Sequence, residues 1–224
     1  IGNNFKLSSN KLLTTVAFKI NGKKMYCYEG SIFVAGSAIQ WLRDKLFFFN
    51  NSKDTDKIYS KANPEERVIV VPALTGLGAP HWKPNTRGAI FGLTRNTSIA
   101  DIVKATLDSI SFQTLDLIES MEKDSKIKIK EIRVDGGMIN NSKFLQSLAN
   151  ITQINIIKPK NTETTSLGVA YLSAINSGII KNTKQIENLW KKNYIAKPKL
   201  NKLLVKSNIK IWKKSISMLI SLNF

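Results

Sequence analysis

The chain has 224 residues, of which 42% are hydrophobic, and a formal net charge of +18. This length and apolar content suffice for a folded core in one ordinary domain or two small ones. No apolar run reaches the about 18 residues that a membrane helix needs, and the first residues show no signal pattern, so a soluble, cytoplasmic protein is expected. One cysteine, Cys27, and one histidine, His81, exclude a disulfide framework and a metal centre built from clustered cysteine or histidine.

The positive charge admits a nucleic-acid hypothesis, because clustered cations release counterions from phosphate backbones. Only five of the 34 basic residues are arginine, however, whereas base readout relies on arginine forks. The stretch 181–224 holds eleven lysines against the single acid Glu187 and contributes +10 of the +18. The composition therefore favours a solvated basic tail over a nucleic-acid site.

The first third of the chain predicts a hairpin and a helix. Two β-rich runs, 12–20 and 23–29, flank Asn21-Gly22, which supplies the positive φ angles of a type I′ turn. An apolar stripe at helical spacing predicts a helix over 31–48. The polar stretch 50–66 is expected to form a surface loop or a short irregular helix.

The rest of the chain predicts alternating strands and helices. A short strand over 67–73 is followed by a glycine- and proline-rich excursion over 74–93. Ser98 and Asp101 have the spacing of a capping box and predict the start of a long amphipathic helix. The segments predicted after it are strands over 130–134 and 154–158, helices over 140–150 and 164–177, and lysine-rich helical segments anchored by Trp190 and Trp212. This alternation is typical of an α/β fold.

The familiar catalytic motifs are absent from the sequence. It contains no Gly-x-x-x-x-Gly-Lys-Ser/Thr loop, which excludes a phosphate-loop ATPase. His81 could serve as an acid or base, but it lies in a rigid Ala-Pro-His-Trp segment with no carboxylate near it in the sequence. A structural role is therefore favoured for this histidine.

Two constellations could hold a ligand. Gly136 and Gly137 follow a predicted strand and precede a helix, where bare backbone can approach an anion, and Asn141 lies one turn further on. Gly36 and Gln40, spaced i and i+4, place a bare patch beside an amide that both donates and accepts, which suits a nucleobase or ribose. A tight turn and close helix packing also explain these glycines. On the residues alone, structure is favoured over nucleotide binding.

Six segments resemble, in sequence and in order, the FGGY carbohydrate kinases. They are 29–44, 71–82, the pair 88–93 and 101–108 with the spacing of the family's carboxy-terminal signature, 133–141, and 162–171. The resemblance runs from about residue 12 to residue 179. It implies an α/β fold, the actin-like ATPase (ribonuclease H-like) carboxy-terminal domain, with a mixed sheet flanked by helices. Residues 1–180 would form this nucleotide-binding domain, and 181–224 a lysine-rich, helical C-terminal extension.

The resemblance also implies a site and a reaction. Gly36, Gln40, Gly137 and Asn141 match family positions that contact the adenine nucleotide. The implied reaction is phosphorylation of a polyol by ATP with Mg²⁺, and residues 75–93 favour glycerol, giving glycerol 3-phosphate. In the family, the catalytic base, the glycerol contacts and the phosphate loop precede the matched segments. No catalytic residue is therefore assigned, and the chain is expected to be inactive alone. Expected partners are ATP or ADP, glycerol through an amino-terminal half, and further copies in a homo-oligomer, with no membrane.

Some features depart from the family pattern. Lys83 stands where aspartate is common and Met138 where alanine is common, and the resemblance fades beyond Gly178. Two alternatives stay open. The intact protein could be another FGGY kinase, acting on xylulose or gluconate, or the chain could be a truncated or decayed gene product without catalytic function.

Overall fold

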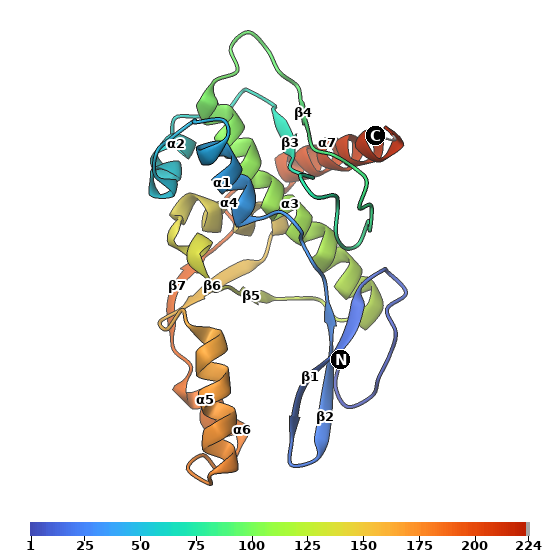
Figure 1. Ribbon diagram of the computed structural model, residues 1–224, viewed down its shortest axis with the longest axis vertical. Coiled ribbons are helices and arrows are strands. Elements are labelled where there is room, and N and C mark those ends of the chain that lie inside the picture. The colour runs from blue at the N-terminus through green and yellow to red at the C-terminus, as the bar shows by residue number, and fades with distance from the viewer. Residues whose placement is uncertain (223–224) are drawn as a thin grey trace.

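The computed structural model describes residues 1–222. Figure 1 shows a helical body with two arms that project from its lower end. The helices are α1 (Gly36–Asp44), α2 (Thr55–Tyr59), α3 (Ile99–Ser125), α4 (Ser142–Thr152), α5 (Thr164–Asn176), α6 (Thr183–Leu189) and α7 (Lys202–Ser221), with short 3-10 turns η1 (Ser52–Asp54) and η2 (Gly137–Asn140). The strands are β1 (Leu13–Ile20), β2 (Lys23–Glu29), β3 (Ile69–Val71), β4 (Ala89–Phe91), β5 (Glu131–Arg133), β6 (Asn155–Pro159) and β7 (Lys192–Ala196).

Helix α3 is the central element of the body. Ser98 and Asp101 form the predicted capping box at its start, because each side chain accepts a hydrogen bond from the other residue's backbone N–H. Buried side chains follow along its length. Helices α1, α2 and α4 pack on α3 around one apolar cluster, whereas β3 and α7 pack around a second cluster that includes Phe112 and Trp212. One long helix thus separates two cores.

The strands form three small sheets. Strand β6 pairs in parallel with β5 and antiparallel with β7, which gives a mixed sheet flanked by helices, as expected. Strands β3 and β4 form a separate antiparallel pair. Strand β3 precedes the predicted glycine- and proline-rich excursion over 74–93, and β4 lies within it. Neither β4 nor β7 is predicted by the sequence. Strand β4 has only three residues, too few to show a period of two, and β7 lies in the lysine-rich stretch without apolar alternation. The lysine-rich segment is therefore not wholly helical.

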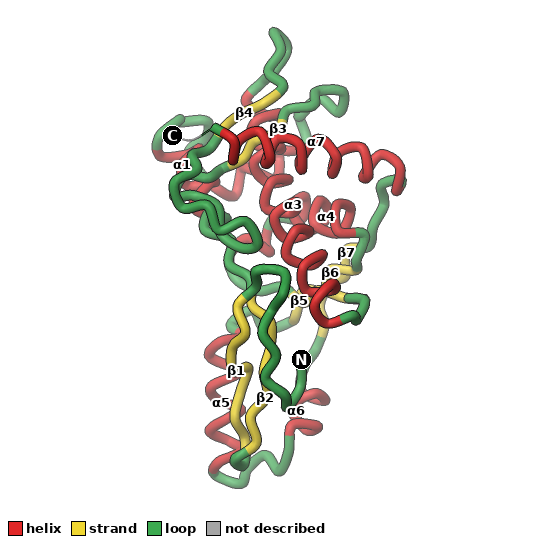
Figure 2. Tube along the Cα trace, turned by 90° about the vertical axis from the view of Figure 1, so that its right-hand side faces the viewer, coloured by secondary structure: helices red, strands yellow, loops and turns green. Residues whose placement is uncertain are grey.

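The predicted hairpin is confirmed. Strands β1 and β2 pair antiparallel, and the turn residues Asn21 and Gly22 have φ angles of 49° and 77°. Cys27 lies half-buried on β2, with its Sγ 3.4 Å from the Thr15 Oγ1. The hairpin forms one arm, and α5 with α6 forms the other; both lie at the same end of the molecule in the second view (Figure 2). No helix within residues 1–222 is long and apolar enough to span a bilayer.

Two local predictions are refined by the structure. The helix predicted over 31–48 is shorter, running from Gly36 to Asp44, because the backbone of Ala35 is not helical, with φ −119° and ψ −95°, and Phe47 adopts a left-handed φ of 56° beyond the helix end. Trp212 is fully buried and stacks on Phe112 with ring centroids 5.3 Å apart. Its predicted role as a packing anchor is confirmed.

Candidate functional site

A cavity of about 820 Å³ lies between α1, the η1–α2 segment, and η2 with the start of α4. All four residues singled out in the sequence, Gly36, Gln40, Gly137 and Asn141, line it. Ile39, Leu107 and Met138 give it an apolar part, and Ser52, Lys53, Thr55, Asp56 and Asn140 complete the lining. Two segments about a hundred residues apart in the sequence therefore meet at one cavity of the size that ligand pockets have.

Helix α1 presents Gly36 and Gln40 to the cavity on one face, one turn apart. A Cβ on Gly36 would lie 3.7 Å from the Met138 sulfur, an ordinary van der Waals contact, so packing within the protein does not require glycine here. Gln40 is exposed and makes no side-chain hydrogen bond within residues 1–222. Its amide is available to a ligand as both donor and acceptor.

The paired glycines after β5 have different reasons to be glycine. Gly136 has a φ of 84°, a left-handed conformation that favours glycine. Gly137 has no such angle, and no atom lies within 4 Å of the position that its Cβ would take. The backbone thus accounts for Gly136, whereas at Gly137 the missing side chain keeps the cavity wall open.

Asn141 has a structural role that sequence reasoning missed. It is the N-cap of α4, where its Oδ1 accepts a hydrogen bond of 2.8 Å from the Phe144 N–H. Its Nδ2 donates to the Thr55 Oγ1 at 3.0 Å. Both polar ends of the amide are therefore engaged within the protein, and a ligand at this wall meets an amide that is already held in place.

Asp56 was also missed as a member of the site. Its carboxylate accepts hydrogen bonds from the Ser142 Oγ at 3.0 Å and from the Lys143 N–H at 2.9 Å, at the start of α4. The negative charge offsets the positive end of the α4 dipole. The signal was weak, because a polar run such as 50–66 is what any surface loop shows.

The lining of the cavity does not suit a metal ion. Asp56 is its one lining carboxylate, and that group already accepts hydrogen bonds from α4. Within the described part of the chain, no three histidine, cysteine, aspartate or glutamate side chains gather in a way that could hold a metal. Mg²⁺ favours octahedral oxygen coordination from carboxylates, phosphates and water. These residues therefore do not supply a Mg²⁺ site.

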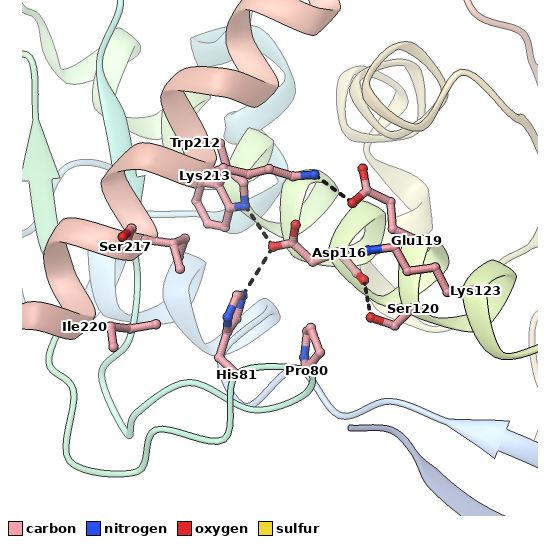
Figure 3. A pocket seen from close by; sticks show the side chains of 11 residues that line it. Pro80, His81, Asp116, Glu119, Ser120, Lys123, Trp212, Lys213, Ser217 and Ile220 are labelled. Atoms are coloured by element: carbon pink, nitrogen blue, oxygen red, sulfur yellow. Dashed lines mark hydrogen bonds and ion pairs between the residues drawn. The ribbon is translucent and has the colours of Figure 1, made fainter. Parts of the chain in front are cut away.

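A second cavity, of about 380 Å³, lies between α3, α7 and the loop that carries His81 (Figure 3). His81 has no carboxylate near it in the sequence, but the fold brings the Asp116 Oδ2 to 3.5 Å from its Nε2, which makes no hydrogen bond within residues 1–222. The same oxygen accepts a hydrogen bond of 2.9 Å from the Trp212 Nε1, and Lys213 pairs with Glu119 at 2.6 Å. These contacts join α7 to α3, so the polar residues that line the second cavity have a role in packing.

Comparison with known proteins identifies the family. The model of the C-terminal domain of the FGGY family of carbohydrate kinases matches residues 3–177. A glycerol kinase of Streptococcus gordonii is 45% identical over 215 residues, which are 96% of this chain and 43% of that protein. A glycerol kinase of Streptococcus pneumoniae, strain Hungary19A-6, is 44% identical over the same share. The chain thus spans less than half the length of these curated relatives.

Solved structures agree with the sequence match. The crystal structure of Plasmodium falciparum glycerol kinase with ADP has a TM-score of 0.89 and 32% identity, covering 97% of this chain and 44% of that one. A ligand-bound xylulose kinase from Lactobacillus acidophilus has a TM-score of 0.86 at 21% identity, over 99% of this chain and 45% of its own, and supports the fold alone. The expected actin-like, ribonuclease H-like fold is confirmed. The chain belongs to the FGGY family of carbohydrate kinases and contains its C-terminal domain.

Proposed function

We propose that this chain is the nucleotide-binding part of a kinase that transfers the γ-phosphoryl group of ATP to glycerol, giving glycerol 3-phosphate. The observation that carries the proposal is the meeting of Gly36 and Gln40 with Gly137 and Asn141 at one cavity. Identity of 44–45% with glycerol kinases favours glycerol over xylulose or gluconate. The sequence identity with the xylulose and gluconate kinases of known structure is 21%, which supports only a shared fold.

In this proposal each of the four residues contributes differently to binding adenosine. The Gln40 side-chain amide contacts polar atoms of the base or ribose, because it makes no hydrogen bond within residues 1–222, whereas both ends of the Asn141 amide are already hydrogen-bonded. Gly36 and Gly137 let the nucleoside approach bare backbone on two walls of the cavity. Asn141 acts by capping α4 and by holding Thr55, so that the second wall keeps its shape.

Phosphoryl transfer needs more than this site. The nucleophile must be held in line with the γ-phosphorus, and a base must accept the proton of the attacking hydroxyl. We assign no catalytic residue among residues 1–222 and propose that the base and the glycerol contacts belong to another part of the intact protein, so that this chain alone is inactive. Mg²⁺ would neutralise charge on the phosphates.

The proposal extends to the domain boundary and the oligomeric state of the protein. We propose a nucleotide-binding domain over 1–180, near the end of the family match at residue 177, followed by the segment 181–224, which packs on it through β7 and α7. A cytoplasmic homo-oligomer is likewise a proposal. Sedimentation of the intact protein tests the oligomer, and a single monomeric species would contradict it.

The test of nucleotide binding is calorimetric titration of the chain with ADP. Gly137→Val places a branched side chain in the cavity, and we expect it to raise the Kd at least about tenfold, as loss of one good contact does. Gly168→Val is the matched control, because Gly168 also has open space around its Cβ position but lies on α5, outside the cavity. A folded chain that does not bind millimolar ADP, or equal effects of the two variants, would contradict the proposal.

The proposed substrate needs the intact protein. Phosphorylation assays with glycerol, xylulose and gluconate as acceptors should show turnover of glycerol first. Turnover of xylulose or gluconate without glycerol would refute the assignment of substrate while leaving the nucleotide site in place.

A further inference from the structure

One buried carboxylate on α3 joins the two helices that wall the cavity. The Asp108 Oδ1 accepts hydrogen bonds from the Tyr59 hydroxyl of α2 at 2.9 Å and from the Ser147 hydroxyl of α4 at 2.5 Å. The Oδ2 accepts from the Lys104 Nζ at 2.5 Å. Asp108 is 9% exposed. A single side chain therefore connects α2, α3 and α4.

Tyr59 is a donor to this carboxylate at every ordinary pH. Burial of the phenol, followed by the negative charge of Asp108, raises the pKa of Tyr59 well above its usual range. The hydroxyl therefore stays protonated and has Asp108 as its acceptor. Removing the carboxylate would leave the Tyr59 and Ser147 hydroxyls to find other partners in a buried site, which is unfavourable.

The position of this contact relates it to the cavity. Thr55, which lines the cavity, lies one helical turn before Tyr59 on α2, and Leu107, which also lines it, precedes Asp108 on α3. At the cavity itself, Thr55 and Asp56 bind the first residues of α4. Helices α2 and α4 are thus tied at the cavity and again at Asp108, which does not line it.

We propose that Asp108 is a positioning residue for the nucleotide cavity, which holds α2 and α4 at the separation that an adenine nucleotide needs. The inference rests on the proposed function of that cavity. Asp108 acts through Tyr59 and Ser147, and does not touch the ligand. It also gives a physical reason for the acidic residue that ends the 101–108 signature segment.

Helix α3 itself provides a matched control. Asp116 lies eight residues further along and is 7% exposed, close to the burial of Asp108. It accepts a hydrogen bond from the Trp212 Nε1 of α7 and faces the second cavity (Figure 3). Asp116→Ala therefore removes an equally buried α3 carboxylate without touching the walls of the nucleotide cavity.

The experiment combines ADP titration with amide hydrogen exchange on the wild-type chain, Asp108→Ala, Asp108→Asn and Asp116→Ala. We expect Asp108→Ala to raise the Kd for ADP about tenfold, as loss of a buried acceptor does, and to speed exchange in 55–63 and 142–147. Asp108→Asn keeps an oxygen for Tyr59 and Ser147 and should recover most of the affinity. Asp116→Ala should speed exchange in α7 and leave the Kd for ADP unchanged.

Two results would overturn the inference. One is a folded Asp108→Ala variant with wild-type affinity and wild-type exchange in α2 and α4. The other is an equal loss of affinity in Asp116→Ala, which would reduce the effect to general destabilisation. Absence of ADP binding by the wild-type chain contradicts the proposed function instead, and the exchange map then decides by itself whether Asp108 holds the two helices.

Discussion

Helices α4 and α5 have similar lengths, 11 and 13 residues, and each follows a strand–turn segment, but they pack very differently. Helix α4 gathers its apolar residues on one face, buries seven of its residues and is capped by Asn141. Helix α5 has no charged residue, has no side-chain cap and buries no residue. A surface helix normally carries charged residues on the face that meets solvent. The uncharged sequence of α5 thus fits a more covered environment than residues 1–222 provide.

The same contrast separates the helical body from the hairpin arm. Along β1, the side chains of Leu13, Val16 and Phe18 are exposed, whereas α1 and α3 bury their apolar stripes. Both arms extend from the same end of the molecule (Figures 1 and 2). The cavity belongs to the well-packed body, so its geometry is set by contacts within the described chain.

The largest expected difference is in core packing. Leu148 of α4 is 3% exposed, and Leu148→Ala should lower the free energy of unfolding by about 2–5 kcal/mol through the cavity that it leaves. Leu172 of α5 is 45% exposed, and Leu172→Ala should change it by less than about 0.5 kcal/mol. Denaturant titration of both variants measures the difference. Similar losses would mean that α5 is packed in solution.

The second largest expected effect is on the hydrogen bonds that hold residues 8–10, just before the hairpin arm, to α3 of the body. Burial alone would raise the pKa of Asp124 at the end of α3, but hydrogen bonds from Ser8, Asn10 and the Ser9 N–H outweigh it and lower the pKa. A lowered folded-state pKa stabilises the protein above the unfolded value of about 4, and this stability is lost as the pH falls through the folded value.

Asp124→Asn should therefore lower stability at neutral pH by roughly 1–2 kcal/mol, as weakened hydrogen bonds to a charged group do, and flatten the acid limb of the stability curve. Thermal unfolding between neutral pH and about pH 3 checks both. The control is Asp54→Asn, at an exposed position on η1 away from this contact. An unchanged acid limb in Asp124→Asn would show that Ser8, Ser9 and Asn10 are not held by this carboxylate.

A smaller effect is expected at the helix starts. Asn141→Ala removes the cap of α4 and should cost about 1 kcal/mol, whereas Glu163→Ala should leave α5 unchanged, since Glu163 makes no side-chain cap bond. Circular dichroism during thermal melting measures both. Asn141→Asp keeps the capping oxygen and loses the donor to Thr55, so a stable variant with weaker ADP binding would assign the second bond to the cavity wall.

The last expected effect, at Gly137, is on nucleotide affinity rather than on stability. Gly137→Ala meets no atom within 4 Å and no left-handed backbone angle, so the free energy of unfolding should change by less than about 1 kcal/mol. The affinity for ADP should nevertheless fall, because the methyl group enters the cavity. Gly168→Ala on α5 should not change ADP affinity, and calorimetry compares the two. Unchanged binding in Gly137→Ala would place the nucleoside away from this wall.

Local signals in the sequence were sufficient for part of the structure. The Asn21-Gly22 turn and the capping box of α3 were predicted because their causes lie within a few residues. The four cavity residues were placed together by resemblance to the family, since their spacing alone fitted ordinary turns equally well. The hydrogen bonds of Asn141 to Thr55 and of Asp108 to Tyr59 span 86 and 49 positions, and only the fold reveals such pairings.

The uncovered apolar arms have a consequence for how copies of this chain behave together. A net charge of +18 makes copies repel one another over distances set by the ionic atmosphere, while the exposed side chains of α5 and β1 attract one another at contact. Salt shortens the range of the repulsion to about 8 Å at physiological ionic strength, and leaves the apolar attraction in place. The colloidal stability of this chain therefore falls as salt is added, because copies associate through the exposed apolar side chains of α5 and β1.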